Sequence, residues 1–317
     1  MSYDTADTSI GAPAPRSDAC NARKNPAVPH RARRSGDKEA PLAAASALGC
    51  TRFRMRPAAT EPDCPMALSS TRSTVVIPCF NEAQRLDVDA ILEYIDQTPW
   101  VRLLFVDDGS TDRTREVLSD LHAKRPERLD VLALPSNRGK AEAVRLGVTQ
   151  ALKDGCDFVG FWDADLSTPL RDIDAFARIL ESRPHLLVVF GSRVRLLGHR
   201  VDRRTARHYS GRVFATVVSL TLRLPVYDTQ CGAKLFRVTP TTVGLFEEPF
   251  HSRWVFDVEL IARMIVAARQ QGMGGVADLI FEQPLMQWRD VPGSKLNLWS
   301  YVKSAFDVYR IHRRYLR

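Results

Sequence analysis

The chain has 317 residues, of which 44% are hydrophobic and 26% are charged. This composition is typical of a globular protein with a large core, and it excludes collagen-like, wholly disordered and disulfide-scaffold proteins. The formal net charge of +8 favours a polyanionic partner such as nucleic acid, anionic lipid or a phosphate ester, and no apolar stretch is long enough to predict a membrane-spanning helix.

The beginning of the chain differs from the rest. Residues 1–70 are rich in Ala, Pro, Arg, Ser and Asp, and they show no sustained hydrophobic periodicity. Such a segment cannot bury enough apolar surface to offset the entropy of the chain, so we expect a disordered, mildly basic tail. We predict two further parts, a folded domain over residues 71–296 and a basic amphipathic helix over residues 297–317.

Strand and helix patterns alternate after the tail. Short β-branched or apolar runs predict strands at residues 74–78, 101–106, 131–134, 158–162 and 186–190. Amphipathic patterns predict helices at residues 84–96, 111–123, 139–153 and 170–182. The strands are nearly continuous apolar runs, as expected for a parallel sheet that helices cover on both faces. The pattern therefore predicts an α/β fold.

Polar motifs follow the predicted strands. They are Pro-Cys-Phe-Asn-Glu at residues 78–82, Asp-Asp-Gly-Ser-Thr-Asp at 107–112, Asn-Arg-Gly-Lys at 137–140 and Asp-Ala-Asp at 163–165. Each alone would be explained by a turn or a helix cap. Because ligands of open parallel sheets bind beyond the carboxyl ends of the strands, the four motifs together predict one binding site.

The Asp-Ala-Asp motif carries the most specific chemistry. Asp163 and Asp165 supply hard oxygen ligands for Mg²⁺ or Mn²⁺, which take few protein ligands and complete their shell with substrate phosphates. A metal there would stabilise the charge of a departing diphosphate. The sequence has neither a P-loop nor a Gly-x-Gly-x-x-Gly turn after a strand, and its six cysteines form no Cys-x-x-Cys pair.

Residues 73–296 resemble a family 2 glycosyltransferase with the GT-A fold, in which a mixed sheet that binds nucleotide sugars is flanked by helices. The four motifs occur in that family's order. Later segments resemble its dolichyl-phosphate β-glucosyltransferase branch, with the mannose synthases as the nearest other branch. These segments are Gly-Ser-Arg at 191–193, residues 228–236, residues 253–259 and Gly-Ser-Lys at 293–295. The resemblance implies an inverting transfer of a hexose, expected to be glucose, from a UDP-sugar to a polyprenyl phosphate.

The resemblance also implies roles for single residues. Those expected to border the nucleotide sugar are Pro78, Asn81, Glu82, Asp107, Asp108, Lys140 and Asp163. Asp163 and Asp165 are the expected metal ligands. Mannose synthases usually have Gln two residues after the second aspartate, whereas this chain has Ser167, which weakens a mannose assignment.

A basic segment precedes an apolar one in the second half of the chain. Residues 193–212 contain seven arginines and a single acid, Asp202, and residues 211–224 have helical periodicity. This arrangement fits a helix that lies in the plane of an anionic membrane, with Arg heads at lipid phosphates. A core helix with a solvated Arg face is the alternative. Our candidates for binding the acceptor phosphate are Arg193, Arg207 and Ser210, since Arg offers bidentate, always-charged donors.

The last seventeen residues are again basic. Residues 301–317 contain five Lys or Arg side chains against Asp307, with aromatic residues among them. They predict either a second membrane contact or a solvated terminal helix. We expect peripheral attachment to the cytoplasmic face of a membrane, with no nucleic-acid partner.

These residues predict a mechanism with three catalytic groups. A phosphate monoester acceptor is already anionic, so it needs no strong general base. The predicted catalytic residues are Asp165, Arg193 and Asp228. Asp228 would be the base if the acceptor were a saccharide or small-molecule hydroxyl, which is the alternative activity. A non-catalytic basic module that binds membranes or nucleic acid is the alternative of another class.

Overall fold

The computed structural model of the protein describes residues 71–202, 205–289 and 298–317, with the backbone alone for residues 202, 205–210 and 298–302. The predicted tail at residues 1–70 lies outside the described residues. The three described cysteines, Cys79, Cys156 and Cys231, are free thiols.

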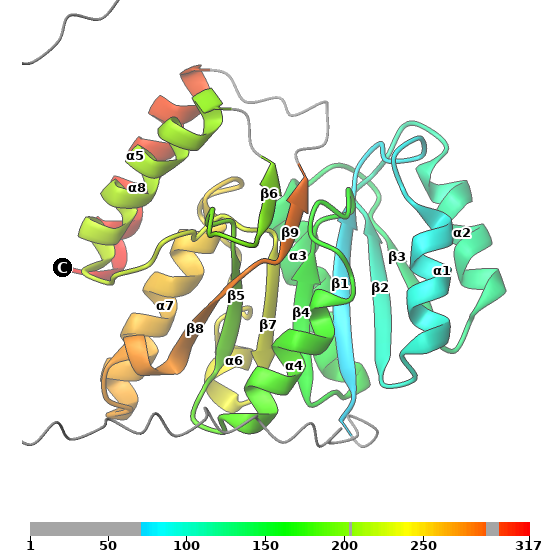
Figure 1. The fold of residues 1–317 in the computed structure, drawn as a ribbon, viewed down its shortest axis with the longest axis horizontal. Helices are drawn as coiled ribbons and strands as arrows, with labels where there is room; N and C mark the ends of the chain where they lie inside the picture. Colours follow the sequence, from blue (N-terminus) through cyan, green and yellow to red (C-terminus); the bar gives the residue numbers. More distant parts are fainter. Residues whose placement is uncertain (1–70, 203–204, 290–297) are drawn as a thin grey trace, which may run out of the picture. The chain divides into compact units, whose positions relative to one another are not determined.

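A mixed sheet forms the centre of the fold (Figure 1). Within the described chain it has seven strands in the order β3-β2-β1-β4-β7-β5-β8. Their bounds are β1 Ser73–Cys79, β2 Val101–Asp107, β3 Leu129–Ala133, β4 Phe158–Trp162, β5 Val188–Ser192, β7 Ala233–Arg237 and β8 Ile280–Pro284. A second, parallel pair joins β6 (Arg200–Asp202) to β9 (Gln287–Arg289). The four strands β6 to β9 were not among those predicted.

The direction of β7 determines which loops meet. β7 runs antiparallel between β4 and β5, and Ala233 at its start pairs with Trp162 at the end of β4. The start of an antiparallel strand lies at the edge where its parallel neighbours end. Residues 228–232, which lead into β7, therefore arrive beside the Asp-Ala-Asp motif.

Alternating side chains of the strands build a core on each face of the sheet. Val75 and Ile77 of β1 face one core cluster, whereas Val76 between them faces the other, and all three are fully buried. Burying an aliphatic side chain of this size contributes about 1.5–3 kcal/mol. The expected covering of both faces is confirmed, although the sheet is mixed and not purely parallel.

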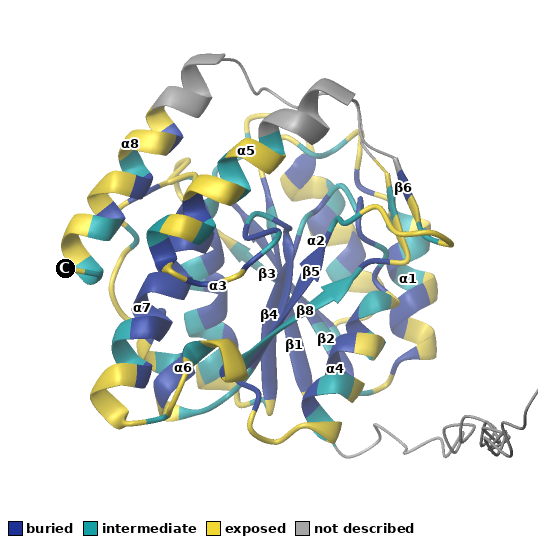
Figure 2. Ribbon diagram, turned by 60° about the vertical axis from the view of Figure 1, so that its left-hand side comes forward, coloured by how far each residue is buried: buried dark blue, intermediate teal, exposed yellow. Residues whose placement is uncertain are grey.

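Helices cover the two faces in separate groups (Figure 2). The first group consists of α1 Val88–Gln97, α2 Thr114–Lys124 and α4 Asp172–Ser182. The second consists of α3 Lys140–Asp154, α6 Pro240–Gly244 and α7 Phe256–Gln271, with a 3-10 helix at Val276–Leu279. The helices α5 (Thr205–Leu222) and α8 (Leu298–Tyr315) pack together and against α7. Val308 and Ile311 of α8 are buried in that second cluster.

Two helices begin later than expected, and a side-chain cap explains the start of the first. Asp87 accepts a hydrogen bond from the Ala90 amide at 3.1 Å, so α1 begins at Val88 and not at residue 84. The helix α2 begins at Thr114. Its N-cap residue, Arg113, makes no side-chain capping hydrogen bond, and Asp112 accepts from the Thr114 amide at 3.0 Å in the turn before the helix. None of the described helices combines the length and apolar content needed to cross a lipid bilayer.

Candidate active site

The loops after β1 and β2 are fastened to each other. The Asn81 side chain accepts a hydrogen bond from the Thr111 amide at 2.9 Å, and its own amide donates to Ser110 Oγ at 3.1 Å. Asn81 has a positive φ of 57°, a conformation that Asn tolerates better than most residues. The Glu82 amide donates to Thr114 Oγ1 at 2.8 Å. The structure thus brings the 78–82 and 107–112 motifs together, as predicted.

The carboxylates of Asp107 and Asp108 hold neighbouring loops in place through hydrogen bonds. Asp107 is fully buried, and it accepts from the Ser110 amide and from Arg115 Nε, both at 2.9 Å. Asp108 accepts from the amides of Arg138 at 2.7 Å and Gly139 at 2.9 Å. Burial raises the pKa of Asp108, although these two amides oppose the rise. Both carboxylates therefore hold the rim of the site in place, a structural task that the motif did not reveal.

Lys140 and Asp163 form an ion pair at the carboxyl edge of the sheet. Burial opposes the ionisation of Asp163, but the charge of Lys140 outweighs it and lowers the pKa of the carboxyl. Burial likewise opposes the charge of Lys140, and Asp163 outweighs it and raises the pKa of the ammonium group. Asp163 is thus a carboxylate at neutral pH, and Lys140 is a cation beside it.

Asp165 lies two residues further on, in a tight turn. Its Oδ1 accepts from the Ser167 amide at 3.0 Å, and Leu166 between them has a φ of 48°. A positive φ is unfavourable for Leu, and such strain is typical of segments that position functional groups. The pKa of the Arg85 guanidinium is raised, chiefly by its hydrogen bond to Glu82. The charge of Asp165 adds to this rise, so Asp165 lies within electrostatic range of Arg85.

Arg193 and Asp228 face the same region from the end of β5 and the loop before β7. Arg193 Nε donates to Asp228 Oδ2 at 2.6 Å, and a terminal nitrogen of the guanidinium donates to Oδ1 at 2.8 Å. The Asp228 amide in turn donates to Glu282 of β8 at 2.8 Å. Burial opposes the charge of Arg193, but Asp228 outweighs it and raises the pKa of the guanidinium. The charge of Arg193 also helps to lower the pKa of Asp163. Gly232, four residues after Asp228, lies against the Asp163 carboxylate, so the loop that carries Asp228 reaches the same site.

A buried ion pair that the sequence analysis missed lies beneath this site. Lys234 of β7 is fully buried, and its Nζ donates to Asp257 Oδ1 and to the Cys231 carbonyl, both at 2.6 Å. Burial raises the pKa of Asp257, against the pull of Lys234 and Lys140. The available signal was a charged residue inside the apolar run of residues 233–236, because such a residue needs a partner when the strand is central.

The loop before α7 reaches over the Asn-Arg-Gly-Lys motif. Arg253 Nε donates to the Arg138 carbonyl at 3.1 Å. The neighbouring Trp254 leaves 52% of its surface exposed. The loop is thus in contact with the segment that carries Lys140.

The predicted acceptor residues are only partly described. Arg193 lies in the site, whereas the side chains of Arg207 and Ser210 lie outside the described residues. The following part of α5 exposes the apolar residues Val213, Val217 and Leu220 and buries Val218 and Leu222. The exposed face of α5 is therefore mixed, since these three residues lie among Arg212 and Thr216, and it is not the solvated Arg face of the alternative core helix.

The two motif aspartates suit a divalent cation as part of a shared coordination shell. No group of three or more His, Cys, Asp or Glu side chains in the described residues forms a complete ligand set. Asp163 and Asp165 nonetheless supply two carboxylates at one strand end, and Mg²⁺ or Mn²⁺ bound through so few protein ligands completes its shell with phosphate and water. The residues present therefore fit a metal that arrives with a diphosphate.

Comparison with known proteins gives consistent results. The sequence model of glycosyl transferase family 2 matches residues 74–243. The dolichyl-phosphate beta-glucosyltransferase of Drosophila melanogaster is 33% identical over 262 residues, which cover 78% of this chain and 76% of the relative. The mouse protein of the same name is 30% identical over 258 residues, covering 77% of this chain and 75% of the relative.

Solved structures share the fold. Glucosyl-3-phosphoglycerate synthase from Mycobacterium tuberculosis, in complex with UDP, is 19% identical and has a TM-score of 0.54, with 81% of this chain and 84% of that chain covered. The same synthase with Mn²⁺, UDP-glucose and phosphoglyceric acid has a TM-score of 0.54 at 18% identity, covering 81% and 83% of the two chains. The expected GT-A fold is confirmed.

Proposed function

The chain belongs to glycosyl transferase family 2, and from this premise we propose that it transfers glucose from UDP-glucose to a dolichyl-type polyprenyl phosphate. The relatives that bear the name dolichyl-phosphate beta-glucosyltransferase support the substrates. The observation that carries the proposal is the arginine at the end of β5: Arg193 is held by Asp228, and its charge acts on Asp163. A cation held in a fixed position near an aspartate that can bind a metal suits a reaction between two anionic molecules, the nucleotide sugar and the lipid phosphate.

The donor binds at the loops after β1, β2 and β4. Asp163 and Asp165 would hold Mg²⁺ or Mn²⁺ there, and the solved neighbour with Mn²⁺ and UDP-glucose supports a divalent ion. When bound, this ion neutralises charge on the departing nucleoside diphosphate. Lys140, charged and beside Asp163, contributes a second cation to the same phosphates.

The acceptor approaches from the side of Arg193. A phosphate monoester is largely anionic near neutral pH, so its oxygen attacks without a strong general base, and the task of the protein is to hold it in place. Arg193 binds that phosphate while Asp228 fixes the guanidinium. Attack on the anomeric carbon from the face opposite the diphosphate inverts it and gives a β-linked product from an α-linked donor.

The geometry of Asp228 favours a phosphate acceptor over a hydroxyl. A hydroxyl acceptor needs a base with an oxygen free to take its proton. Both oxygens of Asp228 already accept hydrogen bonds from Arg193. Asp228 is thus better suited to positioning Arg193 than to proton transfer.

The paired helices α5 and α8 supply the membrane contact in this proposal. Val213 and Leu220 of α5 are 67% and 73% exposed, and Phe306 of α8 is 60% exposed, with arginines on both helices. Exposed apolar side chains among cations suit the headgroup region of an anionic bilayer. We place this peripheral contact on the cytoplasmic face, since the three described cysteines are free thiols, as is usual in a reducing compartment.

The test is a transfer assay with extraction of lipid. The full chain is incubated with Mg²⁺ or Mn²⁺, UDP-[¹⁴C]glucose and dolichyl phosphate, and the label is then partitioned between water and organic solvent. We expect label in the organic phase and none when dolichyl phosphate is omitted. Absence of organic-phase label with every common nucleotide sugar would overturn the lipid acceptor. Label transferred to an added saccharide would favour the hydroxyl acceptor instead.

A further inference from the structure

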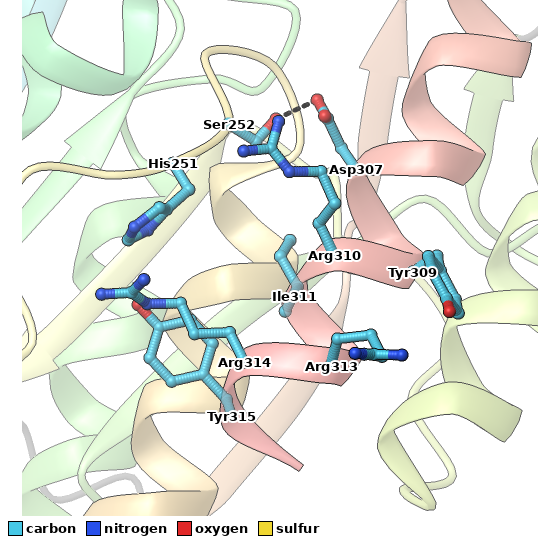
Figure 3. Close-up of a pocket in the computed structure, with 9 residues that line it drawn as sticks. All are labelled: His251, Ser252, Asp307, Tyr309, Arg310, Ile311, Arg313, Arg314 and Tyr315. Atoms are coloured by element: carbon cyan, nitrogen blue, oxygen red, sulfur yellow. Dashed lines mark hydrogen bonds between the residues drawn. The ribbon is translucent and has the colours of Figure 1, made fainter. Parts of the chain in front are cut away.

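A cavity lies between the loop before α7 and one face of α8 (Figure 3). Its volume is about 470 Å³. The loop contributes His251 and Ser252, and α8 contributes residues from Asp307 to Tyr315. The transfer reaction proposed above uses none of these side chains.

A buried carboxylate fixes one wall of this cavity. Glu259 of α7 is fully buried, and it accepts hydrogen bonds from His251 Nδ1 and from the Tyr315 hydroxyl, both at 2.9 Å. Arg263 also donates to it, at 2.8 Å. Burial opposes the ionisation of Glu259, but His251 and Arg263 outweigh it and lower the pKa of the carboxyl. Because Nδ1 of His251 is directed at Glu259, the ring presents Nε2 as its other polar atom.

Guanidinium groups from α8 form the opposite wall. Arg310 and Arg314 are one helical turn apart, and Figure 3 shows their side chains reaching toward the Ser252 and His251 sides of the same space. Arg313 also lines the cavity, on the side of Tyr309. The acid in the lining is Asp307, whose carboxylate accepts a hydrogen bond from the buried Ser252 hydroxyl at 2.7 Å. The lining of the cavity therefore has more cationic side chains than acidic ones.

We propose that this cavity is a binding site for a phosphate group, held by Arg310 and Arg314, with the doubly protonated ring of His251 as a third donor through Nε2–H. Two guanidinium groups one turn apart offer the planar, bidentate donors that match phosphate oxygens. The cavity exceeds the size of a phosphate ion, so it admits a phosphate carried on a lipid headgroup as well as free phosphate. An occupant lies next to Ser252, one residue before Arg253, which contacts the loop that carries Lys140.

Isothermal titration of the full chain with inorganic phosphate tests the site. The double variant Arg310→Gln/Arg314→Gln removes both guanidinium groups, and Lys303→Gln/Arg317→Gln is the matched control because both of its residues are exposed, basic and outside the lining. We expect the first variant to lose at least tenfold in phosphate affinity and the control to lose less than twofold. Equal phosphate affinity in the two double variants would overturn the proposal. It would also be overturned if the unaltered chain gave no heat of phosphate binding and bound no vesicles.

Vesicles distinguish the two sources of the phosphate. Flotation with phosphatidylcholine alone is compared with phosphatidylcholine containing phosphatidic acid. A phosphatidic-acid preference that Arg310→Gln/Arg314→Gln abolishes and the control retains assigns a lipid headgroup, whereas phosphate binding without that preference assigns free phosphate. The variant His251→Gln, which keeps a donor for Glu259, gives a second measurement should the double variant fail to fold. We expect it to lose severalfold in affinity for the same ligand, and an unchanged affinity would contradict the role of His251.

Discussion

Gly232 lies directly against the carboxylate of Asp163: a β-carbon at position 232 would stand 1.8 Å from Asp163 Oδ2. The antiparallel strand β7 causes this contact, because its first residue pairs with the last residue of β4 and places the preceding loop over the Asp-Ala-Asp motif. Because Gly232 has no side chain, the carboxylate of Asp163 occupies the space that a β-carbon at position 232 would need.

Gly232→Ala therefore displaces Asp163 from its position. A misplacement of about 1 Å in a catalytic group costs roughly 100-fold in rate, so we expect glucose transfer to fall by about that factor. Gly244→Ala is the control, since a β-carbon there meets nothing within 4 Å. Steady-state kinetics with UDP-glucose decides the matter, and transfer within threefold of the unaltered chain in both variants would contradict the close contact.

The pair formed by Arg193 and Asp228 separates two kinds of acceptor. We expect Arg193→Gln to reduce transfer to dolichyl phosphate at least 100-fold, because the acceptor phosphate loses its fixed cation. Asp228→Asn keeps an oxygen that accepts from Arg193, so transfer should remain within about tenfold, with a higher KM for the lipid. The exposed Arg269→Gln at the end of α7 is the control and should change neither value.

The opposite ranking of these variants would identify a different chemistry. Loss of all transfer in Asp228→Asn, with the protein still folded, would mean that the carboxylate takes a proton. That result would favour a hydroxyl acceptor.

The buried pair of Lys234 and Asp257 supports the fold beneath the site. Removing one partner of such a pair leaves an uncompensated buried charge, which costs about 3–5 kcal/mol. We expect Asp257→Asn to lower the free energy of unfolding by about 3 kcal/mol, measured by urea denaturation. Asp96→Asn breaks the exposed pair with Arg125 and should leave the free energy of unfolding nearly unchanged, because solvent screens this pair. Equal losses in the two variants would contradict the importance of burial at Lys234.

Asp172 makes stability depend on pH. It lies in the first turn of α4, and its Oδ2 has no hydrogen-bond partner among the described residues. Burial raises its pKa to about 6, with Arg171 opposing the rise and Asp174 adding to it. The folded state therefore holds the proton more tightly than the unfolded state, whose pKa is about 4, and the contribution of this group to stability falls as pH rises between these values.

The substitution Asp172→Asn removes the ionisable group, and with it the loss of stability at high pH. We expect a gain of about 1 kcal/mol in the free energy of unfolding at pH 7.5 and no gain at pH 3.5, from urea denaturation at both values. Asp89→Asn is matched in position, since Asp89 occupies the first turn of α1, but it is exposed and should show no gain. A gain that is the same at both pH values would contradict the raised pKa.

Much of the site could be predicted because parallel strands end at one edge. The apolar runs at residues 101–106 and 158–162 end at polar motifs, and the structure brings Asp163, Lys140 and the motif at residues 78–82 to that edge. The resemblance supplied the later motif at residues 228–236, whose position depends on the direction of β7.

Other features could not be read from local patterns. The partners Lys234 and Asp257 come from different elements, so neither one's neighbours along the chain reveal the pair. The carboxylate of Asp108 accepts hydrogen bonds from the amides of Arg138 and Gly139, which lie about 30 residues further along the chain. The exposed apolar residues of α5 depend on how that helix packs against α7 and α8, which periodicity alone does not determine.

The central claim is that a cation held by Asp163 and Asp165 assists the departure of UDP while an anionic lipid attacks. Its most direct test is the glucosyl-lipid made from UDP-glucose and dolichyl phosphate by the unaltered chain and by Asp165→Asn, with Asp154→Asn as the exposed control. We predict a β-linked glucosyl phosphate by proton NMR, at a rate at least 100-fold lower in Asp165→Asn and unchanged in the control. An α-linked product, or Asp165→Asn turning over at the unaltered rate, would contradict the account.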